Sequence, residues 1–526
     1  MVHPGPKGTK VHPEMPPHQE FPMSTFPNVR PYLPGGNRWP DLLAGLLLIS
    51  FLAGPAAGAT AANFVIPAGT ASYTFNGATQ GVQPGQVIEL AAGVHGPRTF
   101  RNIVGTASQP VIIRSAAGGQ AVVRRGDPAS GGFVFGIRAS RHFVLDGGNI
   151  STTVSGYPYG IKIMYASNAT ATSQDAPSAF LKTMGDTTTP QVFNNCSDFS
   201  IRHVEIDGGW PTHASDGIGI TTNDHQFKAI NYPGARQENI VIEHTFVHNT
   251  QGEGYYIGPN YYGGGVPLRN VDIRHNVVSD TAWDGIQLKS PIEGDNRIHH
   301  NYVRNVGRES DPASQGEIFG ISLLDGSGDI YNNFVESSGD TAIQHWIPDL
   351  PSSFGAQRAR IYNNVVIDPG VIGLTARNGI SSGGSATNRV GEATASTFPI
   401  IVNNTIVRAN GWAISISASA AGGSIKDNII VDAVAGAIKA PATVTINNNL
   451  IGKVSDVGFV DPPANNYRLA SHSVARNTGI NEAESPQFDF DDLPRPQDIA
   501  PDRGAFEFRS ESDRNSPAPP QEMTVR

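Results

Sequence analysis

The chain repeats a short phrase of hydrophobic and polar positions: an aliphatic residue, any residue, a polar pair, and two mostly apolar residues. The clear copies are Ile273–Val278, Ile298–Val303, Ile330–Val335, Ile361–Val366, Ile401–Ile406, Ile425–Ile430 and Ile446–Ile451, with degenerate copies at Ile201–Ile206 and Ile242–Val247. Successive Asn residues of the phrase lie 21 (Asn428 to Asn449) to 40 (Asn364 to Asn404) residues apart. This spacing is within the range of solenoid repeats.

A second phrase, often a polar residue followed by Gly and Ile, alternates with the first. Its copies are Asp216–Ile220, Glu253–Ile257, Asp284–Leu288, Phe319–Leu323, Thr341–His345 and Asn378–Ser381. Both phrases are short runs of β-branched and aromatic residues bounded by Gly, Asn and Asp, which favours strands. One strand at the second phrase and two flanking the Asn turn give three strands in each coil, and stacked coils share a core. The sequence therefore predicts an all-β fold, a right-handed parallel β-helix of three parallel sheets and roughly ten coils.

The recurring Asn is expected in a tight turn, because Asn tolerates left-handed backbone angles and hydrogen-bonds nearby main chain. Stacked in register, these side chains are expected to form a ladder between coils. His244, His275 and His300 lie in the same turns. Three stacked His suggest a metal site, but in this fold we expect them to replace ladder Asn residues.

The repeats over residues 64–508 resemble those of the pectate-lyase-like β-helix superfamily. The segments Pro84–His95 and Gly105–Arg114 look like the first coils of chondroitinase B and alginate lyase relatives, and Asn466–Leu469 with Asp498–Phe508 looks like the closing segment of many secreted bacterial β-helix proteins. The resemblance implies a secreted carbohydrate-active enzyme, above all a polysaccharide lyase acting on a uronic-acid polymer. The fold itself hosts many activities.

Composition fits this fold. The 526 residues include 59 Gly and 39 Pro, which suits a turn-dense all-β protein. The net charge of −9 argues against a general nucleic-acid-binding surface, so we expect no nucleic-acid partner. We expect a monomer with one β-helix domain over residues 60–508 and a disordered polar tail over residues 509–526.

The N-terminal region has the pattern of a secretory signal. The apolar run 42–52 is too short to span a membrane comfortably. It follows Arg30 and Arg38 and precedes the small residues Ala57–Ala59, so residues 1–59 are predicted to be an N-terminal extension and signal peptide, cleaved after Ala59. Translation starts at Met1 or Met23. We expect a secreted or periplasmic protein without membrane contact after cleavage.

Alternation of side chains along the second phrase predicts a surface for the substrate. With Ile286 and Leu288 inside, Gln287 and Lys289 are expected on the outer face. The resemblance places the sugar groove of lyases and hydrolases on this face. The predicted substrate-binding residues are Tyr256, Trp283, Gln287, Gln344, His345, Trp346 and Arg377. Alternation turns His345 inward, as a core histidine, unless a bend at Trp346 and Pro348 reverses it.

Asp216, Glu253 and Asp284 occupy one position in three successive copies of the second phrase. Because neighbouring strands lie about 4.8 Å apart, these carboxylates are expected to form a column. Such a column of like charges is costly unless it is offset by a calcium ion, a shared proton or Lys289. The alternative is that each acid merely caps the turn before its Gly.

Lys289 is the predicted catalytic base, together with Asp284, Glu253, Asp216 and Arg308 in the catalytic group. β-Elimination requires a base that removes the C5 proton of a uronic acid and a cation that neutralises its carboxylate. Relatives of the resembled enzymes use Lys or Arg as the base and often Ca²⁺ as the neutralising ion. Arg308 and Arg377 could pair with the substrate carboxylate. The acidic column counts against an unassisted lysine base, and the alternative is an ordinary exposed lysine.

Three functions remain open from the sequence. The first is a lyase that cuts an acidic polysaccharide, with uronate epimerases as a variant. The second is a glycoside hydrolase, because carboxylates about 5 Å apart suit retention and Asp216 with Asp284, about 10 Å apart, suits inversion. The hallmark Asp-Asp and Gly-His-Gly phrases of polygalacturonases are absent from the copies of both repeated phrases. The third is a non-catalytic carbohydrate-binding or surface protein.

Overall fold

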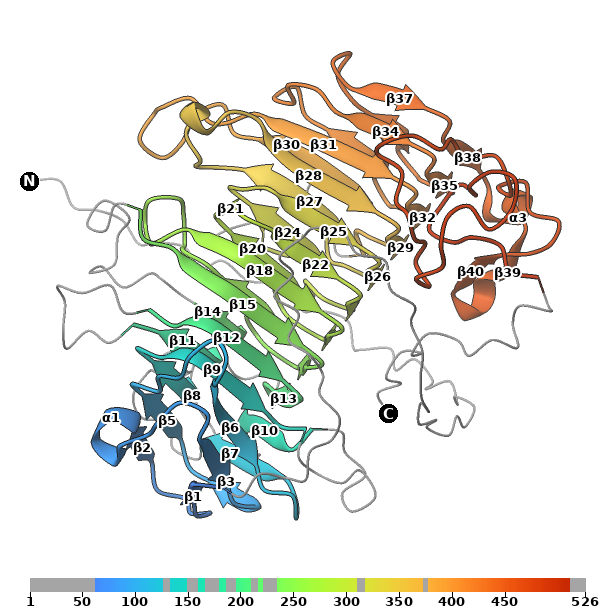
Figure 1. Ribbon diagram of the computed structural model, residues 1–526. Coiled ribbons are helices and arrows are strands. Elements are labelled where there is room, and N and C mark those ends of the chain that lie inside the picture. Colours follow the sequence, from blue (N-terminus) through green and yellow to red (C-terminus); the bar gives the residue numbers. More distant parts are fainter. Residues whose placement is uncertain are drawn as a thin grey trace, which may run out of the picture. The chain divides into compact units, whose positions relative to one another are not determined.

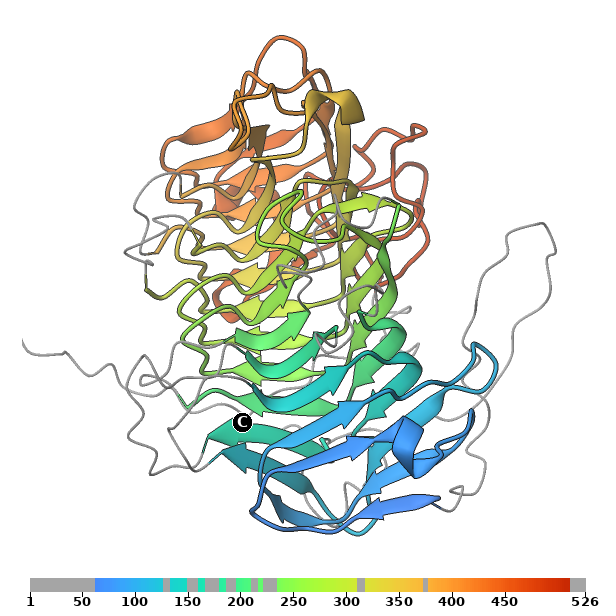
Figure 2. The same ribbon diagram turned by 90° about the vertical axis from the view of Figure 1, so that its left-hand side faces the viewer.

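The computed structural model describes residues 62–125, 133–148, 159–165, 179–185, 195–209, 216–220, 234–309, 317–371 and 377–510. Three parallel sheets, here called A, B and C, run the length of the described coils (Figures 1 and 2). After the first coil, which has strands only in sheets A and C, the chain visits the sheets in the order A, B, C. The fold is therefore a parallel β-helix, and the predicted fold is confirmed. The right-handed sense expected from the sequence agrees with the rule for parallel crossovers.

Sheet A has 14 strands in the described part of the chain, 13 of them in one continuous order. They are β1 (Phe64–Ile66), β3 (Val87–Leu90), β6 (Val111–Ser115), β9 (Arg141–Asp146), β12 (Ser197–Arg202), β15 (Gln237–Glu243), β18 (Leu268–Arg274), β22 (Arg297–His299), β25 (Gly328–Tyr331), β28 (Gln357–Tyr362), β31 (Thr397–Val402), β34 (Ser424–Lys426) and β37 (Thr445–Asn447), with β21 (Pro291–Glu293) beside β18.

Sheets B and C have 12 described strands each, somewhat more than the ten coils expected. Sheet B contains β4 (Gly93–His95), β7 (Ala121–Arg125), β10 (Ile161–Tyr165), β13 (Val204–Asp207), β16 (Phe246–His248), β19 (Val277–Ser279), β23 (Tyr302–Arg304), β26 (Phe334–Glu336), β29 (Val365–Ile367), β32 (Thr405–Val407), β35 (Ile429–Val431) and β38 (Leu450–Gly452). Sheet C contains β2 (Tyr73–Asn76), β5 (Arg98–Arg101), β8 (Phe133–Arg138), β11 (Ala179–Met184), β14 (Asp216–Ile220), β17 (Tyr255–Ile257), β20 (Ile286–Lys289), β24 (Ile321–Leu324), β27 (Ile343–Ile347), β30 (Ile380–Gly384), β33 (Trp412–Ile416) and β36 (Gly436–Lys439).

One apolar core fills the inside of the coils. Successive Ile residues of the first phrase, such as Ile273, Ile298 and Ile330, pair across sheet A and are fully or almost fully buried. The same core contains Ile286 and Leu288 of sheet C and Val278 of sheet B. Each strand thus buries alternate side chains and leaves the others for the outer face.

The Asn ladder predicted from the first phrase is present at the turn between sheets A and B. Asn333 shows its pattern: its Oδ1 accepts hydrogen bonds from the backbone N–H and Nδ2 of Asn301, at 3.1 and 2.9 Å. Its Nδ2 donates to the Ile298 carbonyl at 2.8 Å and to Asn364 Oδ1 at 3.0 Å. The left-handed backbone belongs to the residue before each ladder Asn, such as Asn332 with φ of 51°, and not to the ladder Asn itself. The expected ladder is confirmed, but its residue does not supply the left-handed turn.

Replacing Asn333 with Leu should lower the free energy of unfolding by about 4 kcal/mol, because four buried polar groups each lose one hydrogen bond. Urea unfolding followed by circular dichroism would measure the loss. Asn447→Ala, at an exposed position of β37, is the control and should change stability by less than about 0.5 kcal/mol. An equal effect of both substitutions would contradict this role for the ladder.

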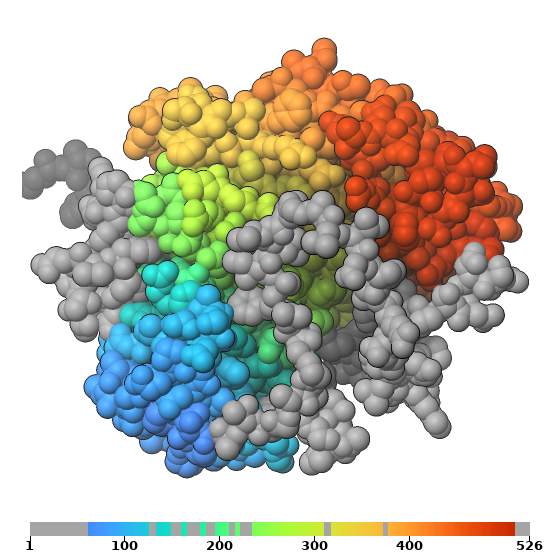
Figure 3. Space-filling view, in the orientation of Figure 1, coloured from blue at the N-terminus to red at the C-terminus, as the bar shows by residue number. Residues whose placement is uncertain are grey.

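The chain after the last coil packs onto the outer face of sheet B. In Figures 1 and 3 this segment (red) lies against the last coils (orange). It contains the helix α3 (Val454–Val457), the antiparallel pair β39 (Phe459–Asp461) and β40 (Asn466–Leu469), and the 3₁₀ turn η3 (Pro462–Ala464). The helix α1 (Gly77–Gln80) and the 3₁₀ turn η2 (Ser352–Phe354) lie between strands of earlier coils. Apolar residues of the segment, such as Phe459 and Phe506, form a second buried cluster with outward residues of sheet B, such as Ile429.

Left-handed Asn residues hold this segment in place. The Nδ2 groups of Asn332, Asn363 and Asn403 donate to the carbonyls of Asp489, Phe488 and Asp502, at 3.1, 2.7 and 3.0 Å. The turn position next to the ladder thus also binds the C-terminal segment.

Several sequence-based expectations concern residues outside the described ranges. They are the signal peptide within residues 1–59 and most of the polar tail. Within the described ranges, no helix is long and apolar enough to cross a membrane.

Candidate functional site

The outer face of sheet C carries the predicted groove residues in register. Tyr256 pairs with Gln287, Gln287 with Ser322, and Ser322 with Gln344. A second outward row runs from Lys289 through Leu324 to Trp346. Gln344 and Trp346 are half-buried. The alternation expected from the second phrase therefore holds along four coils.

The three acidic residues occupy corresponding positions one coil apart. Ile218 pairs with Tyr255 and Tyr255 with Ile286, so the acids two residues earlier, Asp216, Glu253 and Asp284, follow the same register. Asp216 and Glu253 share a side-chain hydrogen bond. We call these three residues the carboxylate column.

Burial makes ionisation of the carboxylate column costly. Glu253 and Asp284 are 1% and 0% exposed. Burial raises the pKa of Asp216 to about 6, although this residue keeps some exposed surface. Burial, and next the charge of Asp216, raises the pKa of Glu253 well above its usual value. Burial and then the charge of Glu317 raise the pKa of Asp284 to about 7. Close carboxylates in low dielectric favour protonation or a bound cation.

Hydrogen bonds fix Asp284 but leave part of Glu253 unpartnered. Asp284 accepts from Gln287 Nε2 at 2.9 Å and from the backbone N–H of Phe319 at 2.8 Å. Glu253 Oε2 is buried and has no hydrogen-bond partner among the described residues. A buried carboxylate oxygen without a partner is costly, so this atom marks where a cation or a substrate donor would be accepted.

Lys289 lies beside the column and is not an ordinary exposed lysine. It is 6% exposed. Its Nζ donates to the Tyr256 hydroxyl at 3.3 Å and lies 4.4 Å from the centre of the Tyr256 ring. Glu317 Oε1 is 3.8 Å from the same Nζ. The site reaches solvent through Asp216, Tyr256 and Glu317, which are each half-buried.

Two further residues of this site were missed from the sequence. Glu317 acts on all three members of the column through its charge. Each acid of the column directly precedes the Gly of the second phrase, whereas Glu317 stands three residues before Gly320 and is therefore out of register. Lys182, whose charge favours ionised Asp216, pairs with Gly219 from a strand that lacks the Gly-Ile phrase.

The other predicted site residues are dispersed. Trp283 is half-buried and directly precedes Asp284. Arg308 is exposed, and its Nη1 lies 3.3 Å from Asp280 Oδ1. Arg377 is exposed at the start of a later coil, where its backbone N–H donates to Asp340. Arg308 and Arg377 thus each contact an Asp outside the carboxylate column.

The His345 side chain points into the core of the β-helix and cannot line a groove on the outer face of sheet C. It is 0% exposed, its Nε2 donates to the Gly326 carbonyl at 3.0 Å, and its Nδ1 lies 3.1 Å from Ser382 Oγ. The inward direction given by alternation holds, and no bend at Trp346 reverses it. Its assignment to the substrate-binding set is therefore corrected.

His345 should make stability depend on pH, because burial lowers its pKa to about 4. In the unfolded chain this histidine takes up its proton near pH 6.5, whereas in the folded chain it does so only near pH 4. The contribution of His345 to the free energy of unfolding is therefore complete above pH 6.5 and falls by about 3 kcal/mol as the pH is lowered towards 4. Urea unfolding at pH 7.5 and 4.5 should show a smaller pH effect for His345→Gln than for the parent chain. His472→Gln, at an exposed position, should keep the parent's pH effect; a reduced effect there instead would contradict the assignment.

A second group of metal-ligating residues lies on the outer face of sheet B. One ligand atom each of Glu205, Asp207 and His248 lies within 4.8 Å of the others. However, Lys162 Nζ is 2.7 Å from Glu205 and 3.3 Å from Asp207. The lysine already compensates the charges of this group.

The predicted histidines stack, but not as members of the Asn ladder. His203, His244, His275 and His300 occupy the left-handed positions, with ring centres 5.5, 5.2 and 4.9 Å apart in succession. Burial, and next the charge of His300, lowers the pKa of His275 to about 3. Ring stacking accounts for this arrangement without a metal.

No family model matches the sequence, and no curated protein matches it. Among solved structures, the chain is similar to the pectate lyase Pel9A, with 14% identity and a TM-score of 0.44 over 84% of this chain and 98% of that one. It is also similar to the PL6 family polysaccharide lyase Pedsa3628 from Pseudopedobacter saltans, with 10% identity and a TM-score of 0.40 over 83% of this chain and 100% of that one. A third similar structure is the PL6 family alginate lyase AlyGC, with 14% identity and a TM-score of 0.38 over 72% of this chain and 51% of that one. The fold assignment rests on the three parallel sheets described above.

Proposed function

We propose that this protein is a polysaccharide lyase that cleaves a uronic-acid-containing polysaccharide by β-elimination, with Lys289 as the base. The observation that carries the proposal is a buried lysine on the outer face of sheet C, which contacts the Tyr256 hydroxyl and whose charge acts on Asp216 of the carboxylate column. Such a combination of an amine, a phenol and carboxylates with raised pKa values is typical of a catalytic site.

Lys289 would act in its neutral form. The amine takes the C5 proton of the uronate, the electron pair forms the C4–C5 double bond, and the bond from C4 to the glycosidic oxygen breaks. The leaving oxygen then needs a proton, which the ammonium group of Lys289 can return. The Tyr256 hydroxyl, 3.3 Å from Nζ, orients the amine. A base positioned in this way contributes about 10²- to 10⁴-fold to the rate.

Calcium fits the carboxylate column. Ca²⁺ prefers several oxygen ligands, and Asp216, Glu253 and Asp284 would supply them, including the unpartnered Glu253 Oε2. A bound calcium ion would neutralise the substrate carboxylate and so make the C5 proton more acidic. The ion would also offset the negative charge next to Lys289. Because that negative charge favours the ammonium form, its neutralisation would favour the neutral amine.

Gln344 and Trp346 would bind neighbouring sugar units. They lie on the same outward rows as Gln287 and Lys289, two coils further along sheet C, which is about 10 Å at the spacing of adjacent strands. A half-buried Trp offers an apolar surface for a sugar ring. An acidic polymer would therefore run along the helix axis over sheet C.

A glycoside hydrolase is the second candidate. The observation that favours it is the raised pKa of Asp284, about 7, which would keep a carboxylic acid protonated near neutral pH. Such an acid can protonate a leaving oxygen while a second carboxylate acts as nucleophile or base. The lyase is preferred because the hydrolase leaves the buried Lys289 without a role.

The test is a panel of uronic-acid and neutral polysaccharides incubated with the protein, with and without calcium. Ultraviolet absorbance of an unsaturated uronate, together with new reducing ends, identifies a lyase. Reducing ends without that absorbance identify a hydrolase. No product from any member of the panel would contradict both enzymes and leave a non-catalytic binding protein.

We also propose that the protein is secreted or periplasmic and acts as a monomer. The support for secretion is the signal-like segment of residues 30–59. N-terminal sequencing of protein recovered from the culture medium or periplasm should begin at residue 60, and light scattering should give the mass of one chain.

A further inference from the structure

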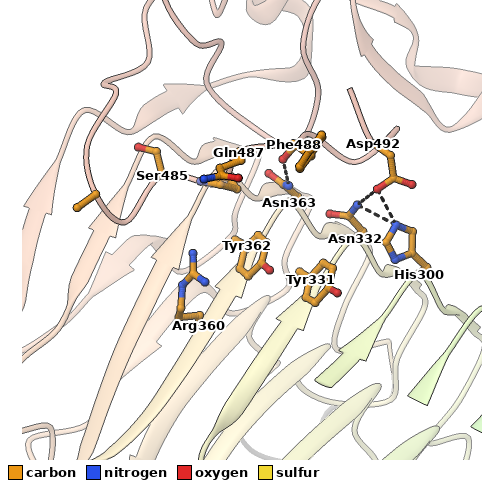
Figure 4. Close-up of a pocket in the computed structure, with 12 residues that line it drawn as sticks. His300, Tyr331, Asn332, Arg360, Tyr362, Asn363, Ser485, Gln487, Phe488 and Asp492 are labelled. Carbon is orange, nitrogen blue, oxygen red and sulfur yellow. Dashed lines mark hydrogen bonds and ion pairs between the residues drawn. The ribbon is translucent and has the colours of Figure 1, made fainter. Parts of the chain in front are cut away.

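A cleft of about 510 Å³ lies away from the carboxylate column, between the outer face of sheet A and the C-terminal segment (Figure 4). Its floor comes from β25, β28 and the turns after them, and its wall from residues 483–492. This volume is within the range of small-ligand sites. The cleft is lined by His300, Tyr331, Asn332, Arg360, Tyr362, Asn363, Ala483, Ser485, Pro486, Gln487, Phe488 and Asp492.

Tyrosine hydroxyls form part of the floor. The rings of Tyr331 and Tyr362 stack 4.8 Å apart at an angle of 1°, and His299 stacks 4.5 Å from the other side of Tyr331. Because these ring faces are covered, the edges and hydroxyl groups are left to meet a ligand. Neither hydroxyl makes a hydrogen bond to another described residue. Burial raises the pKa of both tyrosines, so both hydroxyls are protonated donors.

Other polar groups of the cleft also lack partners. Arg360 lies over Tyr362, 4.8 Å from its ring centre. Among the described residues it has one ion-pair contact, 3.3 Å from Nη1 to Asp329 Oδ2. Arg360 Nε has no hydrogen-bond partner among the described residues, and the same holds for Oδ1 of Asn332, a residue only 3% exposed. A cation, two hydroxyl donors and an amide acceptor thus line one cleft (Figure 4).

The wall adds an aromatic ring and is already fixed in position. Phe488 is 51% exposed at the cleft, which is unusual for so large an apolar side chain. Its carbonyl accepts from Asn363 Nδ2 at 2.7 Å, and the Asp489 carbonyl accepts from Asn332 Nδ2. Because the floor holds the wall, a ligand would not have to order it.

We propose that this cleft is a second saccharide-binding site, separate from the groove on sheet C, which takes one or two units of an acidic oligosaccharide. The sugar ring packs on Phe488, its carboxylate pairs with Arg360, and its hydroxyls bond to Tyr331, Tyr362 and Asn332. The choice of an acidic sugar rests on the proposed function. The site would retain a polymer chain on the protein while another part of it lies over sheet C.

The test is calorimetric titration of full-length Lys289→Ala protein, which cannot consume the ligand, with tetragalacturonate and tetramannuronate and with neutral cellotetraose. At least one acidic tetrasaccharide should bind at two sites. Adding Arg360→Gln or Phe488→Ala should weaken one of the two by at least about tenfold. Arg358→Gln, an exposed arginine on the same strand that does not line the cleft, is the matched control and should keep both sites.

Thermal melting of each variant separates lost binding from lost folding. Binding that is unchanged in both cleft variants, or cellotetraose binding as tightly as the acidic sugars, would overturn the proposal. The product assay with the parent chain is read separately. A protein that forms no product yet loses acidic-sugar binding with Arg360→Gln would retain this site and refute the lyase.

Discussion

Replacing Lys289 with alanine is expected to abolish formation of the unsaturated uronate, with a loss of about 1,000-fold in kcat and little change in KM. The reason is that Lys289 on β20 is the proposed base for the C5 proton, whereas the proposed substrate contacts at Gln344 and Trp346 are untouched. Continuous ultraviolet absorbance on the polymer identified by the panel measures the rate.

Two companion variants make this result specific. Lys439→Ala removes an exposed lysine from the same face of sheet C in its last coil and should keep full activity. Lys289→Arg keeps the positive charge but replaces the amine with a guanidinium, which gives up a proton less readily, so its kcat should fall well below that of the parent. Activity in Lys289→Ala close to that of the parent would contradict the role of this residue as a base.

The sequence predicted the parts of this structure that repeat. A side chain's direction follows from its place in a strand, so the outward rows from Tyr256 to Gln344 and from Lys289 to Trp346 could be derived before any coordinates. The carboxylate column could be derived in the same way, because Asp216, Glu253 and Asp284 share one position of the phrase.

The sequence could not predict what depends on departures from the repeat. Glu317 is displaced by two residues from the register of the column, and only folding brings its charge next to Lys289. The burial of Lys289 itself depends on what covers it, since an outward position in a strand is exposed only if nothing packs on it. The cleft over sheet A likewise requires the C-terminal segment to return over strands more than 100 residues earlier, as the bond from Asn363 to Phe488 shows.

The turn between sheets A and B shows how a correct pattern can receive an incorrect local explanation. Asn was expected there for its left-handed backbone, yet that conformation falls on His275, His300 and Asn332, one residue before the ladder. The ladder residue is Asn because its amide both donates and accepts, so that each side chain can bond to the coil on either side. A sequence pattern fixes the residue type at a position, and two different physical causes can favour the same type.

Calcium should bind to the carboxylate column with an affinity that rises between pH 5 and pH 8. The pKa values of Asp216 and Asp284, about 6 and about 7, mean that protons occupy these groups at pH 5 and have left them at pH 8. Calcium binding at intermediate pH should therefore release protons. Calorimetry in buffers of different ionisation enthalpy counts those protons.

Replacing Glu253 with Gln should weaken calcium binding by at least about 100-fold, because it removes a buried ligand charge and the unpartnered Oε2. Asp207→Asn, in the lysine-compensated group on sheet B, is the matched control and should leave the affinity unchanged, because Lys162 already offsets that charge. The opposite result, with calcium lost in Asp207→Asn and kept in Glu253→Gln, would place the ion on sheet B. The column would then have to be stabilised by shared protons, and Lys289 would face an acidic site with no cation to favour its neutral form.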